Sequence, residues 1–330
     1  MENTFRALRI WEDDTGKVIR KIETRNISDL PEGDVLIKVK YAALNYKDAL
    51  SATGNKGVTR KYPHTPGIDA AGIVAECSDG TFKEGDEVLV TGYDLGMNTD
   101  GGFAEYVRVP SGWVVPLPEG MGLKESMSLG TAGLTAGIGL HKMLTLGQTP
   151  EMGPVVVTGA TGGVGSMAVS MLASAGFEVW ASTGKIGHEE YLKKLGAKKI
   201  VNREFVNDDT GKPLLKPQWA GAFDAVGGNT LATLLKGCMR EGTVASCGLV
   251  SSPTLSTTVF PFILNGINLV GIDSATFPMK ERLLIWEKMA APWKPNHLED
   301  VAKVISLEEL EPYIHQILNG EISGRTLIRL

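Results

Sequence analysis

The stretch VVVTGATGGVGSMAV, residues 155–169, joins a run of valines to a glycine-rich turn and then to a run of small and apolar residues. β-Branched residues favour a buried strand and the later spacing favours a helix, so the stretch predicts a strand, a tight turn and a helix. The first N–H groups of such a helix lack partners within it, and the helix dipole favours an anion there. The turn therefore indicates a diphosphate-binding site, with a turn that serves packing alone as the alternative.

Three known glycine motifs compete for residues 158–166. A P-loop requires a lysine directly after its last glycine, and none follows here. The short-chain dehydrogenase pattern TGxxxGxG fits the glycines, but its catalytic YxxxK pair is missing, because Tyr191 and Tyr313 are followed four residues later by Leu and Ile. The third interpretation is the dinucleotide motif GxGxxG with Ala160 at the first glycine, and the alternating strands and helices around it favour this one.

The end of the next predicted strand indicates which dinucleotide binds. Proteins that bind NAD place an acid about 20 residues after the glycines, where it accepts a hydrogen bond from the ribose 2′-hydroxyl. Here the strand ends with Ser182, Thr183, Gly184 and Lys185, and no acid stands there. Two hydroxyls and a cation suit a 2′-phosphate, so the sequence favours NADPH. Arg203 is a second candidate for that phosphate, and the alternative for both cations is an exposed loop position.

The wider pattern predicts two domains for the 330 residues. Short β-rich runs at 34–44, 70–77, 86–92 and 103–109 suggest a small barrel or sandwich. Residues 124–143 predict a long buried helix. Strand-like and helix-like runs then alternate up to residue 272, as a doubly wound parallel α/β sheet requires. The final GRTLIRL returns to a strand pattern, and its partner strand is expected in the first domain.

Composition and cysteine usage restrict the class of protein. The net charge of -5 provides no basic surface for nucleic acid. The three cysteines form no CxxC pair and are odd in number, which fits a reducing compartment, and the N-terminus lacks the apolar core of a signal peptide. The uncharged tract 243–272 contains prolines and polar residues, so it predicts two buried strands joined by a polar loop and no membrane span. We therefore expect a cytoplasmic protein.

Several motifs together resemble the medium-chain dehydrogenase/reductase superfamily along essentially the whole chain. The β-rich first third is followed by GTAGLTAG (130–137), the glycine turn and FDAVGG (223–228) in the order typical of that superfamily. More narrowly, the chain is similar to the bacterial acryloyl-CoA reductase and quinone oxidoreductase family in LNYKDAL (44–50), PGIDAAG (66–72), EYLKKLGA (190–197), PFIL (261–264) and GRTL (324–327).

This resemblance implies a GroES-like catalytic domain beside a Rossmann domain, NADPH as cofactor, no zinc, and a homodimer formed through the last Rossmann strand. We expect residues 1–125 to form the first part of the catalytic domain, 126–270 the Rossmann domain, and 271–330 to return to the catalytic domain. The catalytic candidates implied are Asn45, Tyr46 and Asp48, with the first two facing the nicotinamide. Tyr46 would donate a proton or wall the pocket, and Asp48 would orient Tyr46 or Lys47 or cap a helix.

The cofactor contacts implied by the resemblance fall into four groups along the chain. They are Tyr46 at the nicotinamide; Thr161, Gly162, Gly163 and Val164 at the diphosphate; Ser182, Thr183, Gly184, Lys185 and Arg203 at the 2′-phosphate; and Leu249, Ile263, Ser274 and Asn319 elsewhere on NADPH.

The residues themselves argue against zinc. Zinc-bearing relatives have GHE where this chain has Gly67, Ile68 and Asp69, and Asn45 stands near the place of a ligand cysteine. Three cysteines also cannot build a four-cysteine lobe. A second GHE, at residues 187–189, lies beyond the second Rossmann strand and is expected to open a helix.

The expected absence of zinc narrows the substrate class, because an alcohol is not readily activated without a Lewis acid. The substrate should accept hydride unaided, as a carbon–carbon double bond conjugated to a carbonyl does. The leading hypothesis is an NADPH-dependent reductase of a short enoyl-CoA such as acryloyl-CoA. A quinone oxidoreductase is the alternative enzyme, and a non-catalytic NADPH-binding protein is the alternative of another class.

Overall fold

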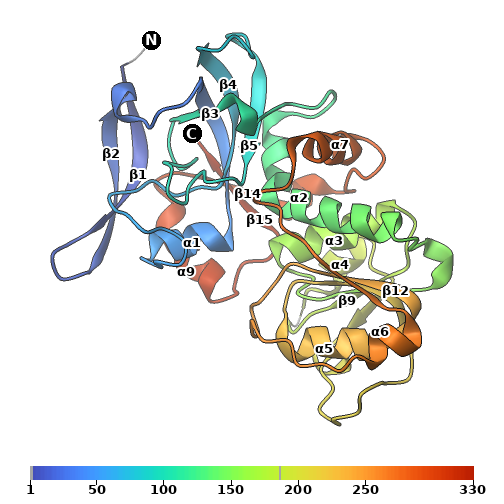
Figure 1. Cartoon of the computed structure of the whole chain (residues 1–330). Coiled ribbons are helices and arrows are strands. Elements are labelled where there is room, and N and C mark those ends of the chain that lie inside the picture. Colours follow the sequence, from blue (N-terminus) through green and yellow to red (C-terminus); the bar gives the residue numbers. More distant parts are fainter. Residues whose placement is uncertain (1–2, 186) are drawn as a thin grey trace. The chain divides into compact units, whose positions relative to one another are not determined.

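The computed structural model describes residues 3–185 and 187–330 and divides the chain into two compact units (Figure 1). The first unit consists of Met1–Thr131, Ala275–Leu283 and Leu298–Leu330, and the second of Ala132–Ser274 and Leu284–His297. The division thus falls after Thr131 and Ser274, where the sequence suggested residues 125 and 270. The chain returns to the first unit in two separate pieces.

The first unit is built on a seven-stranded sheet in the order β14-β15-β3-β4-β5-β7, with β6 paired to β3. A separate hairpin, β1 (Thr4–Glu12) with β2 (Val18–Asn26), was not predicted, because charged residues interrupt both strands. The sheet strands are β3 (Val35–Leu44), β4 (Asp69–Cys77), β5 (Glu87–Thr91), β6 (Tyr106–Val109), β7 (Val114–Pro116), β14 (Ala302–Ser306) and β15 (Arg325–Arg329).

The C-terminal strand β15 joins the middle of this sheet. It pairs antiparallel with β3, with Thr326 opposite Leu44, and parallel with β14. The expected partner of GRTLIRL is therefore found in the first unit. This pairing brings Arg325 to the end of β3, where helix α1 (Tyr46–Ala52) begins. Helix α9 (Leu310–Leu318) packs against α1 through a shared apolar core.

The second unit is a six-stranded parallel sheet in the order β10-β9-β8-β11-β12-β13. The first strand in the sequence, β8, lies inside the sheet, and the chain adds strands first on one side of it and then on the other. The order therefore reverses between β8 and β11. The strands are β8 (Val155–Val157), β9 (Val179–Ser182), β10 (Lys199–Val201), β11 (Trp219–Asp224), β12 (Cys238–Ser246) and β13 (Asn268–Gly271).

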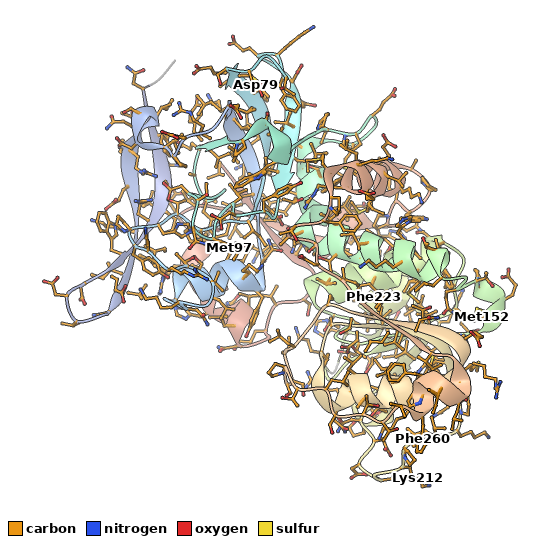
Figure 2. The ribbon with its side chains drawn as sticks, viewed as in Figure 1. Asp79, Met97, Met152, Lys212, Phe223 and Phe260 are labelled. Atoms are coloured by element: carbon orange, nitrogen blue, oxygen red, sulfur yellow. The ribbon has the colours of Figure 1, made fainter. Side chains whose placement is uncertain are left out.

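Small residues allow the long helix α2 (Leu123–Thr145) to pack closely within this unit. A Cβ at Gly139 would collide with the ring of Phe223, a fully buried residue of β11 labelled in Figure 2. The other helices are α3 (Gly163–Ser174), α4 (Glu189–Lys194), α5 (Gly228–Lys236), α6 (Phe260–Asn265), α7 (Met279–Ala290) and α8 (Leu298–Val301). Helix α4 begins directly after His188, as expected for the second GHE sequence.

The uncharged tract 243–272 differs from the expected pair of buried strands. Its second half contains helix α6, and the strand that follows, β13, is a half-exposed edge strand. Both expected strands are present, as the end of β12 and as β13, and only the burial of β13 and the helix between the strands differ from the prediction. Pro261 in the first turn and Gly266 in the left-handed conformation at the end favour this short helix. No described helix has both the length and the apolar character needed to cross a membrane.

Candidate active site

Helix α1 begins with a capping arrangement that uses both oxygens of Asp48. Its Oδ2 accepts the backbone N–H of Asn45 at 2.8 Å, and its Oδ1 accepts the backbone N–H of Ile68 at 2.8 Å. Asp48 is fully buried. Of the roles considered for this acid, helix capping is the one these contacts describe, and they also tie α1 to the loop before β4.

Asn45 and Tyr46 are neighbours in the sequence, but their side chains differ in exposure and in hydrogen bonding. Tyr46, the first residue of α1, is 44% exposed. The amide of Asn45 is instead engaged within the first unit: its Nδ2 donates to Asp69 Oδ2 at 2.8 Å, and its Oδ1 accepts from Arg325 Nη1 at 2.9 Å. Tyr46 is thus the side chain of this pair that solvent and ligands reach.

The carboxylate of Asp69 accepts hydrogen bonds from the N-terminus of a helical segment as well as from an arginine. Gly130 has φ 51 and ψ -153 inside α2, and this break leaves the N–H of Thr131 pointing outward from the second helical segment. That N–H lies 2.9 and 3.0 Å from the two Asp69 oxygens, and Thr131 Oγ1 donates to Oδ1 at 2.6 Å. A side chain at Gly130 would collide with Asp69 and Arg325. The helix expected for residues 124–143 is therefore present as α2, but it is broken at Gly130.

The buried charges of this group are two acids and one base. Asp48, Asp69 and Arg325 are all buried, and Arg325 Nη2 lies 3.3 Å from Asp69 Oδ2. Burial, and then the charge of Asp69, raises the pKa of Asp48 to about 7. Burial lowers the pKa of Arg325, against the opposing effect of the two carboxylates. Burial and the second acid therefore favour the protonated form of Asp48.

In the second unit, the glycine turn follows β8 at the point where the strand order reverses. The backbone N–H of Ala160 donates to Ser182 O at 3.2 Å, and Ser166 Oγ donates to Ala160 O at 3.2 Å. A Cβ at Gly165 would collide with the carbonyl oxygen of Gly159, so α3 begins as close to the turn as backbone allows. The carboxyl edge of a parallel sheet at such a reversal is where dinucleotides bind in this type of fold.

The predicted 2′-phosphate residues gather at the same edge of the sheet. Thr183 and Lys185 follow β9, Arg203 follows β10, and the N–H of Thr183 donates to Val201 O at 3.1 Å. Arg203 lies against Gly184, where any Cβ would collide with its guanidinium. Burial and the nearby Arg203 charge both lower the pKa of Lys185. Two cations held this close to one another favour an anion beside them.

The remaining predicted cofactor contacts are divided between the units. In the second unit, Leu249 follows β12, Ile263 is an exposed residue of α6, and Ser274 follows β13 and accepts from Thr135 Oγ1 at 2.9 Å. Asn319 ends α9 in the first unit, together with Tyr46 near the start of α1. Thr161, Gly162, Gly163 and Val164 form the turn and first helical residues after β8.

Sequence reasoning missed several residues of these two groups. Asp69, Thr131 and Arg325 stand within the quoted motifs PGIDAAG, GTAGLTAG and GRTL, but they received no role. In the second unit, Asp224 accepts from Thr158 Oγ1 at 2.7 Å and from the Gly227 N–H at 2.9 Å, which joins the loops after β8 and β11. An acid at the end of an otherwise apolar strand was the available signal for Asp69 and Asp224.

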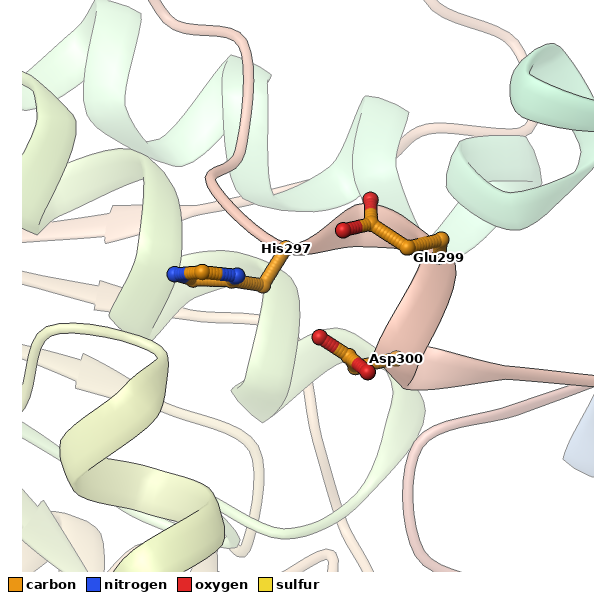
Figure 3. A group of neighbouring side chains, drawn as sticks. All are labelled: His297, Glu299 and Asp300. Carbon is orange, nitrogen blue, oxygen red and sulfur yellow. The ribbon is translucent and has the colours of Figure 1, made fainter.

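Two surface features contain none of the predicted site residues. A hollow of about 320 Å³ on the first unit is lined by acidic side chains, including Glu32 and Glu76, and by Arg108. Figure 3 shows the side chains of His297, Glu299 and Asp300. One potential ligand atom from each of them lies within 4.8 Å of the other two. All three are exposed, and exposed acidic groups of this kind are common on protein surfaces without any ligand.

A glycine turn at the reversal of a parallel sheet, joined in one chain to a β-rich unit, defines a dinucleotide-dependent oxidoreductase fold. Two family models match accordingly: the alcohol dehydrogenase GroES-like domain over residues 31–119 and the zinc-binding dehydrogenase over residues 163–288. The chain belongs to the medium-chain dehydrogenase/reductase superfamily and, within it, to the family of the acryloyl-CoA reductases and related quinone oxidoreductases.

Three relatives document this membership. "Putative quinone oxidoreductase YhfP" of Bacillus subtilis is 46% identical over 100% of both chains, and its structure with NAD bound has a TM-score of 0.97 over 99% of both chains. Acrylyl-CoA reductase AcuI of Ruegeria pomeroyi is 42% identical over 98% of both chains. The YhdH oxidoreductase of Salmonella enterica in complex with NADP is 40% identical, with a TM-score of 0.95 over 98% of this chain and 99% of that one.

The zinc named in one family model does not fit the residues around Asn45. Zinc prefers sulfur and imidazole ligands with a few carboxylates, whereas this group offers an amide, an alkyl side chain at Ile68 and two acids. The oxygens of Asn45 and Asp69 that face this group already accept from Arg325. Arg325 Nε is itself a buried donor without a protein partner, and a donor repels a metal ion.

Proposed function

We propose that this chain is an NADPH-dependent oxidoreductase that transfers hydride to an activated carbon–carbon double bond, with a short enoyl-CoA such as acryloyl-CoA as the leading substrate. The choice of NADPH as cofactor rests on the Lys185–Arg203 pair at the carboxyl edge of the sheet. It also rests on the absence of an acid in the sequence at the end of β9. The relatives named acrylyl-CoA reductase support a short enoyl-CoA as the substrate.

The residues of the chain have separate tasks in this proposal. When bound, NADPH supplies the hydride. Hydride addition to the β-carbon moves negative charge onto the thioester oxygen, and a preorganised donor at that oxygen lowers the barrier. Tyr46 is the proposed donor, because its side chain is 44% exposed whereas the Asn45 amide is held by Asp69 and Arg325. Asn45 then contributes by fixing the start of α1.

A quinone is the second candidate substrate, favoured by the name of the relative YhfP. Quinone reduction needs less help from the protein, because the product is an aromatic hydroquinone whose oxygens take protons from water. A non-catalytic NADPH-binding protein is the third candidate, since the fold alone does not require turnover.

The three candidates separate in one assay of nicotinamide absorbance. Purified protein is mixed with NADPH and acryloyl-CoA, crotonyl-CoA or a simple quinone. We expect acryloyl-CoA to oxidise NADPH, and Tyr46→Phe to lower its turnover roughly 10²–10³-fold, as the loss of one such donor does, while quinone turnover changes much less. Quinone turnover without enoyl-CoA turnover would favour the second candidate. Tight NADPH binding with neither reaction would favour the third.

The same proposal includes a cytoplasmic homodimer that acts on small molecules and binds neither nucleic acid nor membrane. The edge strand β13 and helix α6 support the dimer, because Leu269, Ile263 and Leu264 are exposed apolar residues beside an unpaired strand edge. A second copy would continue the sheet across a twofold axis. The net charge of -5 supports the absence of a nucleic-acid partner.

A further inference from the structure

Three segments far apart in the sequence meet at the start of α1. Asn45 directly follows β3, and Asp69 is the first residue of β4. Arg325, 280 residues beyond Asn45, is the first residue of β15. Each of the three side chains contacts the other two: Asn45 Nδ2 to Asp69 at 2.8 Å, Arg325 Nη1 to Asn45 at 2.9 Å, and Arg325 Nη2 to Asp69 at 3.3 Å. A closed triangle of this kind restricts the orientation of all three side chains.

We propose that Arg325 and Asp69 are positioning residues of the active site, which hold Asn45 and through it fix the neighbouring Tyr46 for catalysis. The inference rests on the proposed function. The guanidinium organises the oxygens of Asn45 and Asp69 by donating to both, and it supplies no Lewis acidity.

The hydrogen bonds leave Asn45 one orientation. Its Nδ2 faces carboxylate oxygens of Asp69 and Asp48, at 2.8 and 3.3 Å, while its Oδ1 faces the guanidinium of Arg325. A flipped amide would place the oxygen against two acids and the NH₂ group against a cation. Arg325 Nη1 also reaches Leu44 O at 3.4 Å, so the backbone just before Asn45 is held as well.

The charges make Arg325 necessary for this arrangement. Asp48 and Asp69 are both fully buried acids, and Arg325 is the cation in direct contact with Asp69. Thr131 completes the shell of Asp69 with its N–H and its hydroxyl. Without the guanidinium, two buried carboxylates would face each other across the Asn45 amide, and the start of α1 would lose its fixed geometry.

The test compares Arg325→Lys with a matched control, Arg282→Lys. Arg282 is a fully buried arginine of the same unit, and it donates to Thr91 O at 2.7 Å and to Ala275 O at 3.1 Å, both of which lie outside α1. We expect Arg325→Lys to lower kcat for acryloyl-CoA at least tenfold, with the NADPH Kd within threefold of wild type. Arg282→Lys should lower Tm and leave kcat within threefold.

A double variant separates positioning from a general structural effect. In the Tyr46→Phe background, Arg325→Lys should lower kcat less than threefold further, because both changes act on the same donor. Should the two effects simply multiply, Arg325 does not act through Tyr46 and the inference is overturned. If Arg325→Lys does not fold, Asp69→Asn takes its place in the same cycle.

One measurement does not depend on turnover. Hydrogen exchange followed by mass spectrometry should show faster exchange over residues 45–52 in Arg325→Lys and unchanged exchange there in Arg282→Lys. Unchanged exchange in both variants would overturn the inference even if the wild type reduces acryloyl-CoA. If the wild type reduces no acceptor but the two variants show the expected exchange, the proposed function is overturned, whereas the positioning of α1 by Arg325 is retained.

Discussion

We expect the choice between NADPH and NADH to depend on Lys185 and Arg203. Both lie at the carboxyl edge of the sheet, one after β9 and one after β10, and the nearby Arg203 charge contributes to the lowered pKa of Lys185. The relatives make the question sharp, because YhdH was solved with NADP and YhfP with NAD. The side chains of this chain therefore have to be tested directly.

We predict that Lys185→Ala weakens NADPH binding about tenfold to a hundredfold and leaves NADH binding little changed. A charge-assisted hydrogen bond to the 2′-phosphate contributes roughly 1.5–3 kcal/mol, which corresponds to that range. Titration of each cofactor followed by nicotinamide fluorescence measures the effect. Lys198→Ala, at an exposed lysine of the same unit, is the control and should change neither Kd. An equal loss for both cofactors would exclude a 2′-phosphate contact.

Asp48 leads to a prediction about pH. Burial and the charge of Asp69 raise its pKa to about 7, while Arg325 and the Asn45 amide face the same pair of acids. Between about pH 4 and 7 the folded protein then holds a proton that the unfolded chain releases. This proton stabilises the fold fully below pH 4, and its contribution is lost as the pH rises toward 7, by at most about 1.4 kcal/mol per pH unit.

The pH prediction is checked by urea unfolding of wild type and Asp48→Asn across this range. The free energy of unfolding of the variant should fall less steeply with rising pH than that of the wild type. Parallel profiles for the two proteins would show that Asp48 titrates at an ordinary pKa. The variant is compared with wild type at each pH, so that the titration of other groups cancels.

At the residue scale, the sequence could indicate side chains only where local pattern or family motifs point to them. Ser182, Thr183 and Lys185 stand at the end of a predicted strand, so their shared edge could be inferred from the topology of parallel sheets. Asp69 and Arg325 could not be paired in this way, because their contact depends on β15 joining β3 from the far end of the chain. The capping role of Asp48 stood among the alternatives that its spacing allowed.

At the scale of elements, turns and breaks in helices decide where backbone N–H groups point. The strands of the second unit and the first helix after the glycine turn were predicted from local pattern, and the structure contains them. The break at Gly130 was not predicted, because glycine also serves close packing elsewhere in α2, at Gly137 and Gly139. Only the position of Asp69 beside Gly130 reveals which glycine changes the direction of the chain.

We predict that Gly165→Ala destabilises the second unit and weakens NADPH binding at least tenfold. Its new Cβ would collide with the carbonyl oxygen of Gly159, and backbone atoms in so tight a turn cannot move aside without opening it. Overpacking of this kind costs roughly 1–3 kcal/mol. Gly112→Ala is the matched control, because a Cβ there meets no atom within 4 Å. Thermal unfolding and NADPH titration of both variants measure the effect, and a normal Kd for Gly165→Ala would contradict a tight phosphate-binding turn.

At the scale of the whole molecule, one stretch of the second unit contains many exposed apolar residues. They follow β12 and continue through α6 and β13: Leu249, Val250, Val259, Phe260, Ile263, Leu264 and Leu269. Leu249 and Ile263 of this set are predicted NADPH contacts, whereas Leu269 lies on the edge strand. We therefore expect the same tract to contribute to cofactor binding and to the dimer interface. The sequence showed an uncharged tract, but only the strand order shows that β13 lies at an edge of the sheet.

We predict that the wild type sediments at twice 35.3 kDa and that Leu269→Lys shifts it toward the monomer at micromolar concentration. Leu269 is 37% exposed on the edge strand β13, where a lysine opposes strand pairing because its charge would have to be buried. Leu144→Lys is the matched control: Leu144 is 36% exposed near the end of α2 and belongs to no strand, and its variant should remain a dimer. A dimer that survives Leu269→Lys but dissociates in Leu144→Lys would move the interface to α2, and a monomeric wild type would exclude it altogether.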